Sequence, residues 1–115
     1  MRSCFDIKLL FSVIRFRMTR SLADEQVVEN NEVTLWVDVA KKASSVIWFR
    51  GGDEVQSNES FIIGVSRGGL RHSLTIRRVT ANEEGEYSVH IDNGNERLIT
   101  SKCNVKIKGA YNVIQ

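Results

Sequence analysis

A polar corner between two stretches of alternating apolar residues constrains the fold of this chain more than any other feature. The apolar residues that flank it are Leu74, Ile76 and Val79 on one side and Tyr87, Val89 and Ile91 on the other. Alternation over short stretches predicts half-buried β-strands, and residues 82–85 between them are polar or glycine. Tyr87 comes soon after the corner, so its buried hydroxyl needs a partner, which a backbone group a few residues back can supply. The sequence therefore predicts two strands that meet at one corner.

Other stretches alternate in the same way and predict further strands. Their inward positions are Val33, Leu35, Val37 and Val39, then Val46 and Trp48, and at the end of the chain Cys103, Val105 and Ile107. Residues 61–66 form another stretch, in which Phe61, Ile63 and Val65 alternate with Ile62, Gly64 and Ser66. Gly51–Gly52 predicts a tight turn, and Asn93–Gly94 is the strongest two-residue hairpin signal. Short alternating strands separated by such turns indicate an all-β domain.

The composition is that of one soluble globular domain. The chain has 115 residues, of which 42% are hydrophobic and 26% charged. Residues 1–20 hold five Lys or Arg against one Asp, whereas residues 21–115 hold eleven basic against thirteen acidic residues. The strand region is therefore near neutral and offers no electrostatic footprint for nucleic acid. No apolar run approaches the ~18 residues that a spanning helix needs, so we expect no membrane insertion.

Residues 16–107 resemble the intermediate-set (I-set) immunoglobulin domains of titin-, twitchin- and obscurin-type giant muscle proteins. The motifs that carry the resemblance are Trp48, Leu74, the corner residues Glu83, Gly85 and Tyr87, and the alternating last strand. The corner is similar to the tyrosine corner of such sandwiches. Glu83 stands where the family usually has Asp, which predicts a looser local cap.

The resemblance implies an immunoglobulin-like β-sandwich with two antiparallel sheets and Greek-key connections. It also implies a first strand split in two, with turns at Asp24–Glu25 and Asn30–Asn31. We expect the domain to span residues 14–109, with an N-terminal extension at residues 1–13 and a C-terminal tail or linker at residues 110–115.

The resemblance further implies that the inter-sheet disulfide of secreted family members is missing here. The two bridging positions are Val37 and Val89. A bridge closing that loop of 52 residues would stabilise a fold by about 4 kcal/mol, while burying two valines recovers ~1.5 to 3 kcal/mol each. A core without the bridge is thus viable and favours a cytoplasmic location. Cys103 is expected to be a buried, inert thiol, and nothing supports a bond between it and Cys4.

We expect a structural core and two outward aromatic side chains. The predicted core residues are Val37, Trp48, Leu74, Ile76, Tyr87, Val89, Cys103 and Val105. Trp36 and Phe49 fall on outward positions and are candidates for a protein-binding surface. The alternative for Trp36 is that it packs on side chains of neighbouring strands.

The sequence contains no convincing catalytic, metal or cofactor motif. His72 and His90 fall on different strands without partners at zinc-ligand spacing, and both are expected to be solvated. The corner carboxylates Glu83, Glu84 and Glu86 are typical of a solvated face. Asn58-Glu59-Ser60 matches the N-glycosylation pattern, which matters only in a secreted protein.

The resemblance implies a non-enzymatic structural and protein-binding module of a cytoplasmic muscle or cytoskeletal protein. Its partners would be neighbouring immunoglobulin domains or cytoskeletal proteins. One alternative is a secreted or cell-surface adhesion domain that lacks its disulfide, and another is a regulatory domain of a larger muscle kinase. Nucleic-acid binding through the basic N-terminal segment is a third, which strongly salt-dependent retention on a polyanion would reveal.

Overall fold

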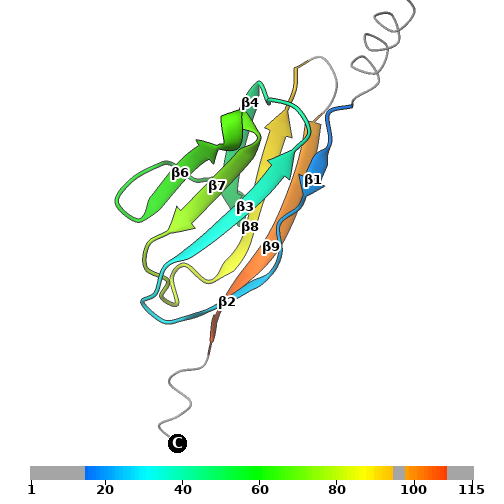
Figure 1. Cartoon of the computed structure of the whole chain (residues 1–115). Coiled ribbons are helices and arrows are strands. Elements are labelled where there is room, and N and C mark those ends of the chain that lie inside the picture. Colours follow the sequence, from blue (N-terminus) through cyan, green and yellow to red (C-terminus); the bar gives the residue numbers. More distant parts are fainter. Residues whose placement is uncertain (1–14, 95–97, 109–115) are drawn as a thin grey trace, which may run out of the picture.

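Two packed β-sheets make up the protein in the computed structural model, which describes residues 15–94 and 98–108 (Figure 1). The strands in these ranges are β1 (Met18–Arg20), β2 (Glu25–Val28), β3 (Val33–Val39), β4 (Ser45–Arg50), β5 (Asp53–Glu54), β6 (Phe61–Ser66), β7 (Arg71–Ile76), β8 (Gly85–Asp92) and β9 (Leu98–Lys108). A short 3₁₀ turn, η1 (Arg67–Gly69), joins β6 to β7. The expected extension at residues 1–13 and tail at residues 110–115 lie outside the described residues.

The two sheets have the strand orders β1-β3-β7-β6 and β2-β9-β8-β4-β5. Strands adjacent in the chain are often placed in different sheets, as the expected Greek-key sandwich requires. All pairings but one are antiparallel. The exception is β2 with β9, which run parallel from Glu25 opposite Val105 to Val28 opposite Lys108. The expected sandwich of two antiparallel sheets is therefore confirmed, with one parallel pairing where the first segment returns to the second sheet beside the last strand.

The first strand is split between the two sheets, as expected. β1 pairs with β3, and after residues 21–24 the chain crosses to pair β2 with β9. Leu22 is buried within the crossing, and its N–H donates to Ser101 Oγ at 3.0 Å. The turn expected at Asp24–Glu25 ends one residue earlier in the structure, because Glu25 already belongs to β2 and pairs with Val105. The crossing segment thus fastens one sheet to the other.

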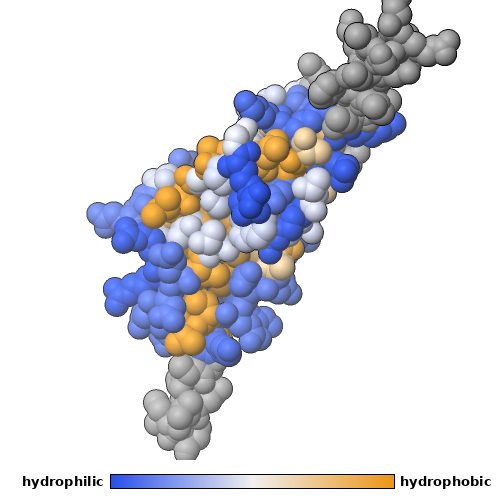
Figure 2. All heavy atoms as spheres, in the orientation of Figure 1, coloured by the Kyte–Doolittle hydropathy of each residue, from blue (hydrophilic) through white to orange (hydrophobic). Residues whose placement is uncertain are grey.

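The strand β6 forms one edge of the four-stranded sheet, and its apolar side chains are unusually exposed. Ile62 is 44% exposed, Ile63 38% and Val65 61%. Figure 2 shows hydrophobic residues along this margin, over β6. Ile63 and Val65 pair in register with the buried residues Leu74 and His72, so alternation alone would place them in the interior. They remain exposed because β5, the edge strand of the opposite sheet, is only two residues long.

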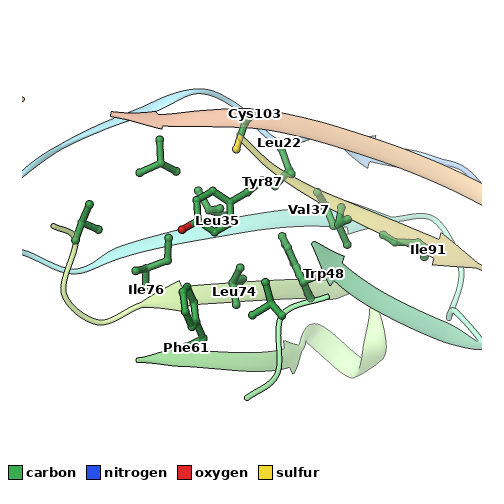
Figure 3. Packing of buried hydrophobic residues seen from close by; sticks show 14 of the residues in the cluster. Leu22, Leu35, Val37, Trp48, Phe61, Leu74, Ile76, Tyr87, Ile91 and Cys103 are labelled. Atoms are coloured by element: carbon green, nitrogen blue, oxygen red, sulfur yellow. The ribbon is translucent and has the colours of Figure 1, made fainter. Parts of the chain in front are cut away.

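The core lies between the sheets and contains the eight residues predicted for it. Val37, Leu74, Ile76, Tyr87, Val89 and Val105 are fully buried, while Trp48 is 1% and Cys103 3% exposed. Figure 3 shows Trp48 and Leu74, which come from opposite sheets, pointing into the same interior. Trp48 pairs with Val89 across β4 and β8. Apolar packing around the Trp48 indole therefore joins the two sheets where secreted family members have a disulfide.

Two connections show how the turns differ from their sequence signals. Gly51 has φ +67°, which fits the tight turn expected between β4 and β5. Gly94 also has a positive φ of 75°, but Asp92 pairs with Leu98, so residues 93–97 all belong to the connection between β8 and β9. The hairpin signalled by Asn93–Gly94 therefore forms between β8 and β9, and its loop is longer than two residues.

Candidate interaction surfaces

The corner before β8 is held by hydrogen bonds that its own residues supply. The Tyr87 hydroxyl donates to the Glu83 carbonyl oxygen at 2.6 Å, which confirms the backbone partner expected for it. Glu83 Oε1 accepts from the Thr80 N–H at 2.9 Å and from the Thr80 hydroxyl at 2.5 Å. Burial acts to raise the pKa of Glu83, but these bonds together with the charge of Arg50 lower the pKa below its usual value. The cap is therefore fully formed with Glu in place of Asp.

Trp36 lies on the outer face of the four-stranded sheet between two arginines. The Arg20 guanidinium carbon is 3.6 Å from the indole ring centroid, and that of Arg71 is 3.8 Å away. Arg20 also donates to the Trp36 carbonyl oxygen. Cations at such distances are attracted by the negative face of the ring. The indole is thus half-buried under two guanidinium groups from β1 and β7. Its contacts are those of the alternative prediction, in which Trp36 packs on side chains of neighbouring strands.

Arg71 is fixed by a second, charged contact. Its Nε and Nη2 donate to the two carboxylate oxygens of Asp38 at 2.7 and 2.9 Å. These hydrogen bonds lower the pKa of Asp38 and raise that of Arg71. A two-point bond of this type orients the guanidinium plane, which here lies over Trp36. The result is a cationic, aromatic surface composed of Arg20, Trp36, Asp38 and Arg71.

Phe49 lies on the outer face of the other sheet, as expected from its position in β4. Its ring centroid is 4.5 Å from that of His90, with the ring planes tilted by 48°. Ile47, the preceding outward residue of β4, pairs with His90 and is 37% exposed. The structure therefore places Trp36 and Phe49 on opposite faces of the sandwich, and it does not combine them into one surface.

His72 departs from its expected solvated position. The side chain is only 8% exposed, and Nε2 has no hydrogen-bond partner within the described part of the chain. Burial lowers the pKa of His72. The prediction was wrong although a signal was present, because His72 alternates with Leu74 and Ile76 and so shares their inward side.

The thiol of Cys103 is buried and unpaired in the structure. Burial raises its pKa to about 11, so the nucleophilic thiolate is scarce near neutral pH. Over residues 15–94 and 98–108, no group of three or more His, Cys, Asp or Glu side chains could hold a metal ion. In the same ranges no helix has the length and apolar character required to cross a bilayer.

Residues 16–107 match the family model of the immunoglobulin I-set domain. The chain belongs to the I-set family. The resemblance inferred from Trp48, Leu74 and the corner is thereby confirmed.

Relatives of this I-set domain include much longer proteins. Cardiac-type myosin-binding protein C of Mus musculus is 30% identical over 77 residues, which cover 67% of this chain and 6% of that protein. Titin of Drosophila melanogaster is 30% identical over 71 residues, covering 62% of this chain and, to the nearest per cent, 0% of titin. The chain therefore spans less than a tenth of these relatives.

Solved titin structures share the architecture of this I-set domain. Titin M4 superposes with a TM-score of 0.75 at 14% identity, covering 82% of this chain and 97% of that one. A chimeric titin Z1Z2 carrying an exogenous decorin peptide gives 0.74 at 27% identity, covering 84% and 48%. The immunoglobulin-like β-sandwich implied by the resemblance is thus confirmed by the fold of titin domains.

The arginines of the Trp36 surface were not among the residues predicted from sequence. Arg20 belongs to β1 and Arg71 to β7, and both lie opposite Asp38 of β3 in the strand register. Alternation tells which residues share a face, but it does not tell which strands of an I-set domain are neighbours or in what register. No signal in the sequence could therefore have placed both guanidinium groups on one indole.

Proposed function

We propose that this I-set domain is a non-enzymatic structural and protein-binding module of an intracellular, titin-like muscle or cytoskeletal protein. The observation that carries the proposal is the bond-free core: Val37 and Val89 are fully buried at the positions where secreted members have a bridge. A core that needs no disulfide suits a reducing compartment. The similarity to titin and myosin-binding protein C supports the same environment.

The pairing of β2 with β9 suits a load-bearing role. The two strands run parallel over four residue pairs. A pull on the two ends of the domain draws β2 and β9 in opposite directions along their length. The backbone hydrogen bonds between them are then loaded together and must break nearly at once. A parallel pair at the two ends of the domain therefore supplies resistance to stretching.

For protein binding, the Trp36 surface has the composition of an interaction anchor. Trp and Arg are enriched among residues that dominate binding energies. Trp36, Arg20 and Arg71 are held in place by ring contacts and by Asp38, so little side-chain freedom is lost on binding. Phe49 with His90 provides a second candidate surface on the opposite face.

Localisation of the tagged parent protein in muscle and non-muscle cells tests the proposal. We expect a striated or filamentous pattern in muscle cells and no passage through the secretory pathway. Trp36→Ala in the isolated chain should weaken capture of cytoskeletal partners, whereas Leu98→Ala, at an exposed position on β9 outside both candidate surfaces, serves as the matched control. Secretion of the parent with glycan on the exposed Asn58 would overturn the intracellular assignment and favour an adhesion domain.

A further inference from the structure

The edge strand β6 lacks the devices by which proteins normally protect a sheet edge. Such edges usually carry charged residues, proline or a bulge. Residues 60–66 contain neither a charged residue nor proline. β6 pairs with β7 over six consecutive residues without a shift in register, from Phe61 opposite Ile76 to Ser66 opposite Arg71. The strand is therefore a regular, uncharged edge.

The hydrogen bonds at the start of β6 show which peptide groups face outward. The Arg77 N–H donates to the Ser60 carbonyl oxygen at 2.9 Å, so this carbonyl faces β7. In an antiparallel pair this direction alternates along the strand. Ile62, Gly64 and Ser66 therefore also bond to β7, while Phe61, Ile63 and Val65 turn their N–H and C=O groups to the edge.

Some of these outward N–H and C=O groups already have hydrogen-bond partners. The Asn58 N–H donates to the Phe61 carbonyl oxygen at 2.8 Å, and the Phe61 N–H donates to Asn58 Oδ1 at 3.0 Å. At the other end the strand passes into η1 at Arg67. Within the described residues, the open peptide groups of the edge are thus those of Ile63 and Val65. These two residues also carry exposed side chains on the interior side of the sheet, where β5 is too short to cover them.

We propose that β6 pairs antiparallel with β6 of a second copy of this chain, about a two-fold axis at Gly64. In this register Ile63 of one copy lies opposite Val65 of the other, and the same pair recurs across the axis. Every open N–H and C=O of the edge then finds a partner, because Ile63 and Val65 exchange both of their bonds. Their side chains cover one another, and Gly64 meets Gly64 at the close pair without a Cβ.

The charges beside β6 favour a second copy in this antiparallel direction. Glu59 precedes the strand and Arg67 follows it, and both are exposed. Antiparallel pairing carries the acidic end of one strand towards the basic end of the other. A parallel pairing would instead set like charges side by side, which is destabilising. The edge is therefore self-complementary in hydrogen bonding, in shape and in charge.

This inference goes beyond the proposed function, which would stand if the chain proved to be a monomer. Sedimentation of the full chain up to about 1 mM tests it, since so short a contact gives a weak complex. We expect a monomer–dimer equilibrium, and Val65→Lys should raise the dissociation constant about tenfold or more by placing a charge against Ile63. Leu98→Lys is the matched control, because Leu98 is 58% exposed but lies on β9, and it should change the constant by less than about twofold.

A cross-link tests the register. Gly64 pairs do not exchange hydrogen bonds across the axis, so their Cα atoms should be about 4.5 Å apart, within the range of a disulfide. In a Cys4→Ser background, Gly64→Cys should form a linked dimer under mild oxidation. Thr34→Cys, which places a thiol at an exposed position on the outer face of the same sheet, should not. A Cβ at Gly64 meets Ser73 Oγ at 3.1 Å, so folding of this variant is checked by its unfolding curve.

A charge exchange supplies a test that leaves β6 itself unchanged. Arg67→Glu should weaken the dimer, and adding Glu59→Arg should restore it. A monomer at about 1 mM, equal effects of Val65→Lys and Leu98→Lys, equal cross-linking at residues 64 and 34, or no restoration by the exchange would each overturn the proposal.

Discussion

The hydroxyl of Tyr87 and the carbonyl oxygen of Glu83 lie 2.6 Å apart and join the start of β8 to the corner that precedes it. Tyr87 is fully buried, so this bond satisfies its one polar atom inside the core. Glu83 uses its side chain for Thr80 at the same time. One residue of the corner therefore serves both the turn and the core.

Replacing Tyr87 by Phe should destabilise the domain by about 1–2 kcal/mol, because the Glu83 carbonyl oxygen loses its donor while the apolar packing is kept. Urea unfolding followed by tryptophan fluorescence measures the change. Ser88→Ala, on the adjacent outward position of β8, is the control and should have little effect. Equal stability of the Phe variant and the parent would show that the corner does not depend on this bond.

The Tyr87 hydroxyl also predicts a loss of stability in alkaline solution. Burial raises its pKa to about 12 from the ordinary value of 10. The unfolded chain therefore ionises first, and the stabilising effect that is present below pH 10 should be lost as the pH rises from 10 towards 12. Unfolding free energies over this range measure the effect. The Phe variant should lose less stability than the parent between the two pH values, and parallel curves would contradict the assignment.

His72 predicts the opposite dependence in acid. Its pKa is lowered by burial, so the folded state prefers the neutral ring. Stability is complete above the unfolded value of about 6.5 and should fall as the solution is acidified below it, since the unfolded chain takes up the proton first. Comparing the parent with His72→Gln between pH 5 and 8 separates this effect from that of the carboxylates. A variant with the same acid slope as the parent would exclude His72 as the cause.

Cys103 should be inert in the folded protein. With a pKa raised to about 11 and a side chain 3% exposed, it offers neither thiolate nor access to a reagent. In a Cys4→Ser background, an alkylating reagent at pH 7.5 should modify the thiol only after urea is added. Mass spectrometry with time follows the reaction. Rapid modification without urea would mean that β9 opens readily.

The absent bridge can be introduced by changing Val37 and Val89 together to Cys. If the two positions face each other as in secreted members, oxidation should form the bond and stabilise the domain by up to about 4 kcal/mol in the chain-entropy account. Thiol titration detects the bond, and urea unfolding with and without reductant measures its effect. Val37→Cys alone is the control and should respond little to reductant. Free thiols in the oxidised double variant would contradict the shared geometry.

Most of the fold could be predicted because alternation records burial directly. The inward sides of β3, β8 and β9 follow from their sequences, and the corner at Glu83 and Tyr87 marks where strands meet. Alternation mispredicts burial where the opposite sheet does not extend over a strand. Ile63 and Val65 are exposed because β5, the edge strand of the opposite sheet, is short. It also does not reveal pairing, so the parallel contact of β2 with β9 was not foreseen.

The candidate surfaces were harder to predict than the core. Trp36 and Phe49 were placed on outward positions, but their contacts depend on residues far away in the chain. Arg71 reaches Trp36 only through the register of β3 with β7, which no local pattern fixes. The expectation of a solvated His72 was wrong because it rested on residue type, whereas the buried Leu74 and Ile76, two and four residues on, mark its position in the strand as inward.

The parallel contact of β2 and β9 also has a consequence during protein synthesis. Residues 25–28 leave the ribosome early, whereas their partners, residues 105–108, belong to β9, which follows every other strand of the sandwich in the chain. The sandwich can therefore close only when nearly the whole domain has emerged. Until then β2 remains unpaired with β9. Where such domains follow one another in a long chain, this delay gives the preceding domain time to finish folding first.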